Sequence, residues 1–433
     1  MDVDTLRSIF RATLDPEYLL ASARSTGAFV RIREIQPVPF LMSLLAGCAF
    51  GAHRDIALSR RLYEQTEGPV ASSTFDDRVD SPGTARWLWS LLCTARTRGN
   101  RAAKRAWPKE LAALTDILLE DGTVCALRGK SSFESTRAGK GAVKLLSTVS
   151  LSDGQMVAVR LAAAVHHDRP LLRGAPVPGA LYLRDLGFYD HGEFVRIAKE
   201  AFLVSRLKLS AVPRLVAITR GLPDHCVGER MTDALPYEAI VDADATVTVE
   251  GEAHTFRVVC VPVPAKNAKG QRIPGQTMAG WYITNLPREQ FDAECIALLY
   301  RLRWAIERVF RRAKQRCALS ALRTRRPTVM ATFVAASLLV LALGTHVTAA
   351  LRDGPSPVAI SEDTVLHVLQ ARWPSMLDWW QQSDPFSTAR WVTLRNVLVY
   401  ETQHRNKKRP LSLNQICGQI ADRTDRHTQP LAA

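Results

Sequence analysis

The spacing of hydrophobic positions changes twice along this chain. Residues 1 to about 112 carry long apolar patches with few β-branched residues, as in PFLMSLLAGCAFGAHRDIALSRRLYEQT, and this pattern predicts helices. From Leu114 a strand-like alternation takes over. The segment AVKLLSTVSLSDGQMVAVRLAAAV holds two such runs, and Ser152-Asp153-Gly154 between them predicts a hairpin.

Further strands and helices follow in mixed order. GALYLRDLGF predicts a strand, HGEFVRIAKEAF a helix and FLVSRLKL another strand. Residues 222–288 form a β-rich block with Gly-rich turns, and a long helix is expected at about 289–317. The last part of the chain reads as helical and basic, with a tail that we expect to be disordered past HRNKKRP.

One apolar segment could be taken for a membrane span. Residues 331–351 run for 21 positions without a formal charge, which is long enough to cross a bilayer. The segment also contains four Ser or Thr residues and a His, and nothing else in the chain resembles a second span. We therefore expect a buried core helix rather than a membrane helix.

The charge balance points to a polyanionic partner. The chain has 57 Lys and Arg against 42 Asp and Glu, a formal net charge of +15, so nucleic acid or an anionic membrane surface is indicated. Its eight cysteines are scattered without zinc-ligand spacing, which argues against zinc fingers and disulfides and for a reduced, cytoplasmic compartment. The start of the chain, MDVDTLRSIF, does not read as a signal peptide.

A basic stretch in the N-terminal region has two interpretations. From Arg86 to Lys109 there are seven basic residues and no acid, interleaved with Trp87, Trp89 and Trp107. The functional interpretation is a surface that binds DNA ends, and the alternative is an ordinary solvated helix face.

The helix around Glu307 has an unusual row of charges. In YRLRWAIERVFRRAK, residues 300–314, Glu307 is the single acid among six basic residues. At about 100° per residue, four side chains fall within about 60° of arc: Tyr300, Arg303, Glu307 and Lys314. Packing does not require such a row. A phosphodiester bound through a metal ion does, because the carboxylate holds the cation while the basic groups hold flanking phosphates.

Two further acids follow strand-like runs. Asp121 lies in EDGT and Asp185 in LYLRDLGF, and each has an alternative explanation as an ordinary turn residue. Asp116 and Glu120 are less suitable first ligands, because Asp116 would lie at the far end of the strand and Glu120 on its other face. The order Asp on a strand, Asp on a later strand and Glu on a helix favours a shared site.

These motifs resemble those of bacterial insertion-sequence DDE transposases. Tyr300-x2-Arg303-x3-Glu307-x6-Lys314 matches the YREK signature of the subgroup that excises its element through DNA hairpins. DGT, LYLRDLGFYDHGEF with FLVSRLK, and GWYITNLP are similar to that family's three acidic motifs, over about residues 112 to 325. The resemblance implies an α/β protein with an RNase H-like catalytic core, a β-rich insertion and helical flanks.

The resemblance also implies a domain plan. We expect a helical DNA-binding region at 1–112, a DDE catalytic domain at 113–350 with its insertion at 222–288, and a helical, basic region at 351–433. Asp121, Asp185 and Glu307 would be catalytic and would bind two Mg²⁺ (or Mn²⁺) ions.

The expected activity is cut-and-paste transposition. Partners would be the terminal inverted repeats of the element and a target DNA, with a homodimer in the synapse and no membrane. Tyr300, Arg303, Lys314 and Trp281 would contact DNA, Trp281 by stacking on a flipped base rather than by core packing. Trp304 is expected to pack, and His166-His167-Asp168 to form a surface turn rather than a metal site.

Two alternatives remain open. One is a nuclease with an RNase H fold and no strand transfer, and the other is a catalytically inactive or domesticated DNA-binding protein.

Overall fold

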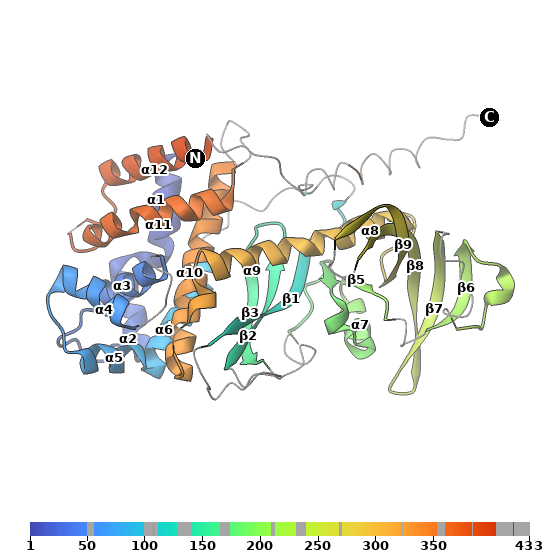
Figure 1. Cartoon of the computed structure of the whole chain (residues 1–433), viewed down its shortest axis with the longest axis horizontal. Coiled ribbons are helices and arrows are strands. Elements are labelled where there is room, and N and C mark those ends of the chain that lie inside the picture. The colour runs from blue at the N-terminus through green and yellow to red at the C-terminus, as the bar shows by residue number, and fades with distance from the viewer. Residues whose placement is uncertain are drawn as a thin grey trace.

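A computed structural model gives the fold of this chain. The structure describes residues 1–49, 56–98, 107, 111–127, 141–164, 174–208, 213–230, 240–267, 271–322, 324–352, 360–382, 384–403 and 419. Helices from both ends of the chain gather on one side, and one long sheet extends away from them (Figure 1). Histidines 166 and 167 and Asp168 lie outside the described residues.

The described strands form one sheet of nine, ordered β3-β2-β1-β4-β5-β9-β8-β7-β6. Their bounds are β1 Ile117–Ala126, β2 Ala142–Ser150, β3 Met156–Ala163, β4 Leu181–Arg184, β5 Phe202–Arg206, β6 Arg214–Arg220, β7 Val241–Val249, β8 Glu252–Lys266 and β9 Arg272–Thr284. β1, β2 and β3 are antiparallel neighbours, whereas β4 and β5 run parallel to β1. The predicted β2–β3 hairpin is confirmed, and Gly154 takes a φ of +75° after its turn.

The predicted β-rich block joins this sheet rather than forming a separate one. β9 pairs antiparallel with β5, and β8 and β7 continue from it. β6 begins at Arg214, so the β-rich region starts before the expected position 222. The expected boundary missed this strand because its residues are mostly exposed and lack a clear apolar alternation.

Helices cover the sheet and build the helical side. Their bounds are α1 Val3–Leu14, α2 Pro16–Ser25, α3 Pro37–Ala49, α4 Ile56–Glu67, α5 Ser72–Val79, α6 Pro82–Arg98, α7 His191–Ala198, α8 Ala293–Arg301, α9 Ala305–Gln315, α10 Pro327–Arg352, α11 Glu362–Trp379 and α12 Thr388–Gln403. α8 and α9 lie on one face of the sheet, where Tyr300 and Ile306 pack with Leu119 and Leu183. On the other face Phe194 of α7 packs with Tyr182 and Leu203.

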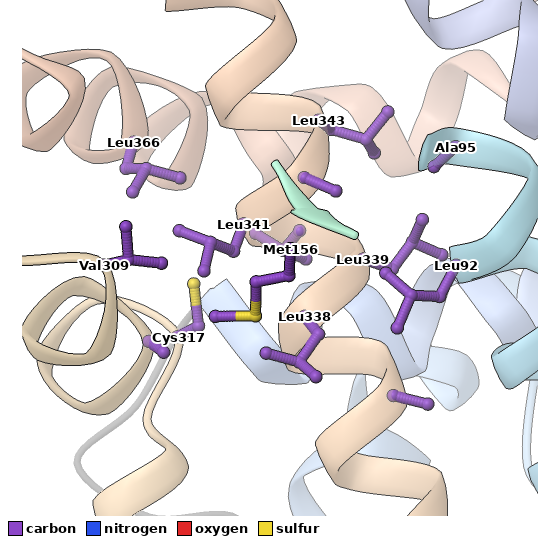
Figure 2. Close-up of a cluster of buried hydrophobic side chains, with 14 of the residues drawn as sticks. Leu92, Ala95, Met156, Val309, Cys317, Leu338, Leu339, Leu341, Leu343 and Leu366 are labelled. Atoms are coloured by element: carbon purple, nitrogen blue, oxygen red, sulfur yellow. The ribbon is translucent and has the colours of Figure 1, made fainter. Parts of the chain in front are cut away.

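α10 is the centre of the helical side. Among the described residues it is the one helix long and apolar enough to cross a membrane, and 89% of its most apolar window is buried. A helix that is apolar all round is typical of a core, and this burial agrees with the expected core helix. Figure 2 shows the leucines of α10 among side chains of four neighbouring elements, α6, β3, α9 and α11.

The two ends of the described chain pack against each other. Trp380 donates its Nε1–H to the carbonyl of Leu14 at 2.9 Å, and Arg395 donates to the carbonyl of Met1 at 3.1 Å. α1 contacts both α12 and α10. The helices before and after the sheet therefore form one packed body (Figure 1).

One tryptophan of the basic stretch in the N-terminal region is a core residue. Trp87 is fully buried, and its Nε1–H donates to Ser22 Oγ at 2.8 Å. Arg86 donates to the carbonyl of Thr26. The interpretation of Trp87 as part of an exposed surface is wrong, because α6 turns this side chain toward α2 and Phe29. Basic residues at 101, 104, 105 and 109 lie outside the described part of the chain.

Candidate active site

Two neighbouring parallel strands bring the first two acids to adjacent positions. β1 and β4 pair from Ile117↔Leu181 to Glu120↔Arg184, and the next residue on each strand is an aspartate, Asp121 or Asp185. Asp121 lies inside β1 and Asp185 immediately after β4, so Asp121 is not part of a hairpin turn. Because side chains alternate along a strand, Asp121 shares its face with Leu119, the face covered by α9.

The third acid comes from a helix that is interrupted. The expected single helix at 289–317 is wrong in detail: α8 ends at Arg301, a 3-10 turn covers Leu302–Trp304, and α9 starts at Ala305. Leu302 keeps nearly helical angles, φ −62° and ψ −24°, so the chain direction continues. Asp292 caps the start of α8 by accepting from the Cys295 amide at 2.6 Å, which explains why the helix begins after 289.

Arg303 lies among all three acids. Its Nη1 donates to Asp121 Oδ2 at 3.0 Å, its Nη2 lies 3.6 Å from Glu307 Oε1, and its Nε lies 4.0 Å from Asp185 Oδ1. The side chain is buried, and its Nε has no hydrogen-bond partner among the described residues. One cation therefore holds together three carboxylates from three elements.

Tyr300 completes this cluster from the end of α8. Its hydroxyl donates to Asp185 Oδ1 at 3.1 Å, and its ring lies 5.1 Å from that of Tyr282 on β9, centroid to centroid. Burial raises the pKa of Tyr300, and the negative charge of Asp185 raises it further against the opposing effect of Arg303. Tyr300 is therefore a hydrogen-bond donor at neutral pH.

The electrostatics of the cluster reflect its acids. Burial raises the pKa of Asp121, and the charges of Asp185 and Glu307 add to this, whereas the Gly122 amide and Arg303 lower it. For Arg303 burial is the largest single effect and lowers the pKa, but the surrounding acids and Tyr300 together raise it. The carboxylates thus need a cation beside them, and Arg303 supplies one.

The acids have the chemistry of a magnesium site, although Arg303 now stands between them. Within the part of the chain that is described, no three His, Cys, Asp or Glu side chains are close enough to hold an ion as they stand. The donors gathered around Arg303 are carboxylate oxygens, which suit Mg²⁺ or Mn²⁺. A buried cation among Asp121, Asp185 and Glu307 marks a place where positive charge is favourable, so the residues fit a divalent ion.

Lys314 lies farther along α9 than the cluster. Burial raises the pKa of Cys125, on β1, to about 11, and the charge of Lys314 lowers it, so this ammonium lies near the far part of β1. In the described chain no ion pair joins Lys314 to Asp121, Asp185 or Glu307. Lys314 is therefore not part of the cluster around Arg303.

Two tryptophans have the opposite environments to those expected. Trp281 is 6% exposed and packs with Val258 and Ile283 on the face of the sheet away from the acids. This burial does not fit stacking on an extruded base, and it corrects the expectation for Trp281. Trp304 is 49% exposed beside Arg303, whose Cζ lies 5.7 Å from its ring centroid, so its assignment as a packing residue is wrong.

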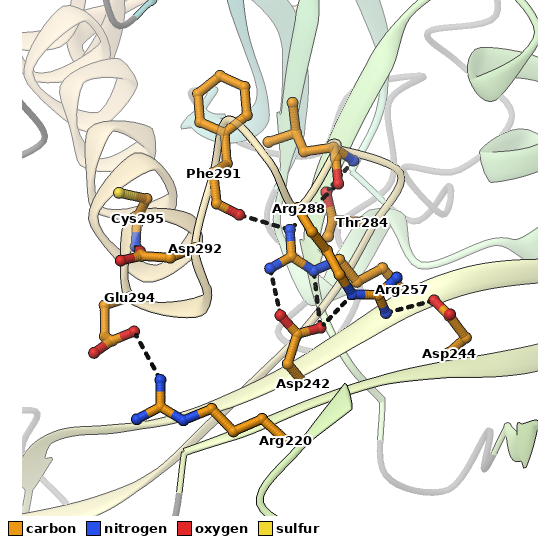
Figure 3. A network of polar contacts seen from close by, with 11 residues as sticks. Arg220, Asp242, Asp244, Arg257, Thr284, Arg288, Phe291, Asp292, Glu294 and Cys295 are labelled. Atoms are coloured by element: carbon orange, nitrogen blue, oxygen red, sulfur yellow. Dashed lines mark hydrogen bonds and ion pairs between the residues drawn. The ribbon is translucent and has the colours of Figure 1, made fainter. Parts of the chain in front are cut away.

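A buried polar network supports the segment that leads into α8 (Figure 3). Arg257 on β8 forms an ion pair with Asp242 on β7 and donates to the carbonyls of Leu286 and Phe291, at 3.3 and 2.7 Å. Arg288 donates to the same aspartate at 3.0 Å. Sequence reasoning missed these residues. The available signal was an arginine inside the apolar run TFRVVCV, since a buried arginine needs paired acceptors.

Comparisons with known proteins agree with one another. Residues 113–343 match the family described as "Transposase DDE domain". The chain is 25% identical over 379 residues to a protein named as the transposase InsL of insertion sequence element IS186A, from Escherichia coli strain K12. It is also 25% identical over 380 residues to the transposase for insertion sequence element IS421 of Escherichia coli. Each match covers 80% of this chain and 95% of the relative.

Proposed function

Because this chain belongs to the transposase DDE domain family, we propose that it moves its own insertion sequence by a cut-and-paste route. The steps would be metal-dependent phosphodiester cleavage, hairpin formation and strand transfer at Asp121, Asp185 and Glu307. One observation carries the proposal: Arg303 lies within 4.0 Å of all three carboxylates, which come from β1, the end of β4 and α9.

The strand order supports an RNase H-like core for the catalytic domain. β3, β2 and β1 are antiparallel, and β4 and β5 continue the sheet parallel to β1. We infer that these five strands are the core and that β6 to β9 are the insertion, added at the β5 edge. In this arrangement Asp121 lies on β1, Asp185 directly follows β4, and α9 packs against β1.

The carboxylates of Asp121, Asp185 and Glu307 would hold two Mg²⁺ ions, with Mn²⁺ as a substitute. When bound, these ions supply Lewis-acid stabilisation of the phosphodiester and activation of water or a DNA 3′-hydroxyl. Asp121 lies within β1, Asp185 directly follows β4, and α9 supplies Glu307. The protein thus contributes a preorganised, negatively charged edge.

Arg303, Tyr300 and Lys314 would hold the DNA backbone around the scissile bond. The Arg303 guanidinium suits two phosphate oxygens, and the Tyr300 hydroxyl can donate one further hydrogen bond. These groups match the YREK signature of hairpin-forming transposases, and we infer that the chain uses the hairpin route. Exposed Trp304, beside Arg303, offers a face on which a displaced base can stack.

The expected partners are double-stranded terminal inverted repeats and a target DNA, bound by a homodimer in the cytoplasm, on the nucleoid. The net charge of +15 supports a polyanionic partner. We infer that the helical N-terminal region, 1–112, contributes to binding of the element ends.

Cleavage of the element's own ends by the purified chain tests this function. A labelled duplex carrying one end, with a target plasmid, is incubated with and without Mg²⁺, and nicked, hairpin and joined products are separated. All three products should appear only with metal. Cutting without joining would identify a nuclease without strand transfer, and end binding without cutting would identify an inactive DNA-binding protein.

A further inference from the structure

A buried ion pair lies directly behind the two aspartates. Glu120 and Arg184 are the last register partners of β1 and β4, and each immediately precedes one of the acids, Asp121 or Asp185. Because side chains alternate along a strand, Glu120 and Arg184 face α7 while the two aspartates face α9. The backbone positions of this pair are therefore directly linked to those of both acids.

The pair belongs to a chain of contacts that crosses three strands and a helix. Arg184 donates from Nε to Glu120 Oε2 at 2.5 Å and from Nη2 to Glu193 Oε1 at 3.1 Å. Thr148 on β2 donates to Glu120 Oε1 at 3.3 Å, and Arg196 donates to Glu193 Oε2 at 2.8 Å. Glu120 and Arg184 are each only 2% exposed. Along this series of contacts Glu120 and Glu193 alternate with Arg184 and Arg196, so the two negative and two positive charges balance.

This part of the sheet needs such a connection. β4 has four residues, and parallel strand pairs are slightly less stable per residue than antiparallel ones. Asp121 and Asp185 carry like charges at adjacent positions, so their repulsion acts to separate the strand ends. A slip of one residue would turn Asp185 toward α7 and leave buried Glu120 without its partner. The ion pair thus favours the single register that brings both acids to α9.

We propose that Glu120 and Arg184 are positioning residues that set the separation of Asp121 and Asp185 for divalent-metal binding. This proposal rests on the proposed function, because it assumes that the two aspartates bind a metal. It differs from a purely structural role in one respect: loss of the pair weakens metal binding in a chain that remains folded.

Mn²⁺ binding to the full chain without DNA tests the proposal. Calorimetric titration of Glu120→Gln should show roughly 10- to 100-fold weaker binding than wild type, as for partners that orient metal ligands. The matched control is Asp116→Asn. Asp116 is also a buried acid next to β1, but it lies at the opposite end and bonds to Ser150 and Ser152, so this variant should bind within about twofold of wild type.

A double-mutant cycle separates a positioning role from general damage to the fold. In an Asp121→Asn background, Glu120→Gln should weaken Mn²⁺ binding less than it does in wild type, since one of the two aspartates that the pair positions is gone. Arg184→Lys is the substitute variant if Glu120→Gln does not fold. It keeps the positive charge but loses the forked contact to Glu120 and Glu193. Its Mn²⁺ affinity should lie between those of wild type and Glu120→Gln.

Wild-type Mn²⁺ affinity in a folded Glu120→Gln or Arg184→Lys variant would overturn the positioning role while leaving the proposed function intact. If Asp121→Asn binds Mn²⁺ as tightly as wild type, Asp121 is not a metal ligand. The proposed metal site and the positioning role would then both be overturned.

Discussion

The guanidinium of Arg303 donates to the carboxylate of Asp121 at 3.0 Å, although 182 positions separate them in the sequence. The same guanidinium lies within 4.0 Å of Asp185 and Glu307. A basic side chain thus occupies the centre of an acidic site, where divalent ions would bind. On the proposed function, metal ions and Arg303 would compete for the same carboxylates, and DNA phosphates would offer Arg303 an alternative partner.

Arg303→Ala should bind Mn²⁺ more tightly than wild type when DNA is absent. Removing one unit charge within about 4 Å of the carboxylates favours the divalent ion, and an effect on the order of tenfold is expected. Titration calorimetry measures it. Arg303→Lys should remain near wild type, and Lys314→Ala, which lacks contact with the acids, should not change the affinity. Equal or weaker binding by Arg303→Ala would show that Arg303 does not compete with metal.

The same Arg303→Ala variant should be slow in catalysis. A lost charge-assisted contact costs about 1.5–3 kcal/mol, or roughly ten- to a hundredfold in rate if the contact tightens in the transition state. Hairpin formation bends the strand most, so nicked DNA should accumulate in Arg303→Ala and Lys314→Ala. A time course on a labelled element end measures both products. Equal loss of nicking and hairpin formation would remove the strand-bending role.

The acids themselves should be indispensable for cleavage. Asp121→Asn, Asp185→Asn and Glu307→Gln should each lower Mg²⁺-dependent cleavage by roughly a thousandfold or more, and double variants should be little worse than single ones. Gel-shift binding to the element end should stay nearly intact. Substantial cleavage by any one variant would exclude that residue from the site.

The two tryptophans should differ in what their loss affects. Trp281→Ala should lower the free energy of unfolding by about 3–5 kcal/mol, because it leaves a cavity in the core. Trp304→Ala should cost under about 1 kcal/mol, as an exposed residue, yet reduce hairpin formation selectively. Urea denaturation and the hairpin assay distinguish the two. A hairpin defect in a fully stable Trp281→Ala would restore the original expectation for that residue.

Acid should destabilise the chain through His346 in α10. Burial lowers the pKa of His346, more than its hydrogen bond to the Ala95 carbonyl and the charge of Asp153 raise it. Below a pH of about 6.5 the unfolded chain takes up a proton that the folded chain does not. The free energy of unfolding should then fall by up to about 1.4 kcal/mol per pH unit. His346→Gln should flatten the pH 7.5 to 5.5 profile, whereas His367→Gln, on the exposed side of α11, should not.

Affinity for the element ends should fall steeply with salt. If phosphate contacts dominate, log K should decrease linearly with log salt by about 0.9 per phosphate neutralised. Fluorescence anisotropy between roughly 50 and 200 mM salt measures this slope, and a flat response would contradict a phosphate-dominated interface.

Periodicity in the sequence was enough to predict which side chains share a face in most of the cluster around Arg303. Two-residue alternation predicts that Glu120 and Asp121 face opposite sides of β1, and the helical projection predicts that Tyr300, Arg303 and Glu307 share a face. The structure shows both arrangements. The 3-10 turn at Leu302–Trp304 left this face intact because its backbone angles remain close to helical.

Periodicity could not show what covers each face. The pattern around Trp281 does not show that its face of the sheet is covered, and the helical pattern around Trp304 does not show that its side chain is left half-exposed. The contacts of Arg257 with Asp242 and with the loop before α8 join segments far apart in sequence. Such pairs depend on strand order and register, which no local pattern encodes.

The burial of α10 has a consequence for how the protein is made. During synthesis α10 follows α6 and α3 but precedes α11. The side of α10 that packs against α11 is therefore uncovered until α11 has been synthesised. The contact of α1 with α12 forms later still, because α12 follows α11 in the chain. The packing of the helical side is therefore complete only once α12 has been synthesised. A product truncated before α11 would leave that side of α10 exposed, and exposed apolar surface of this kind favours aggregation.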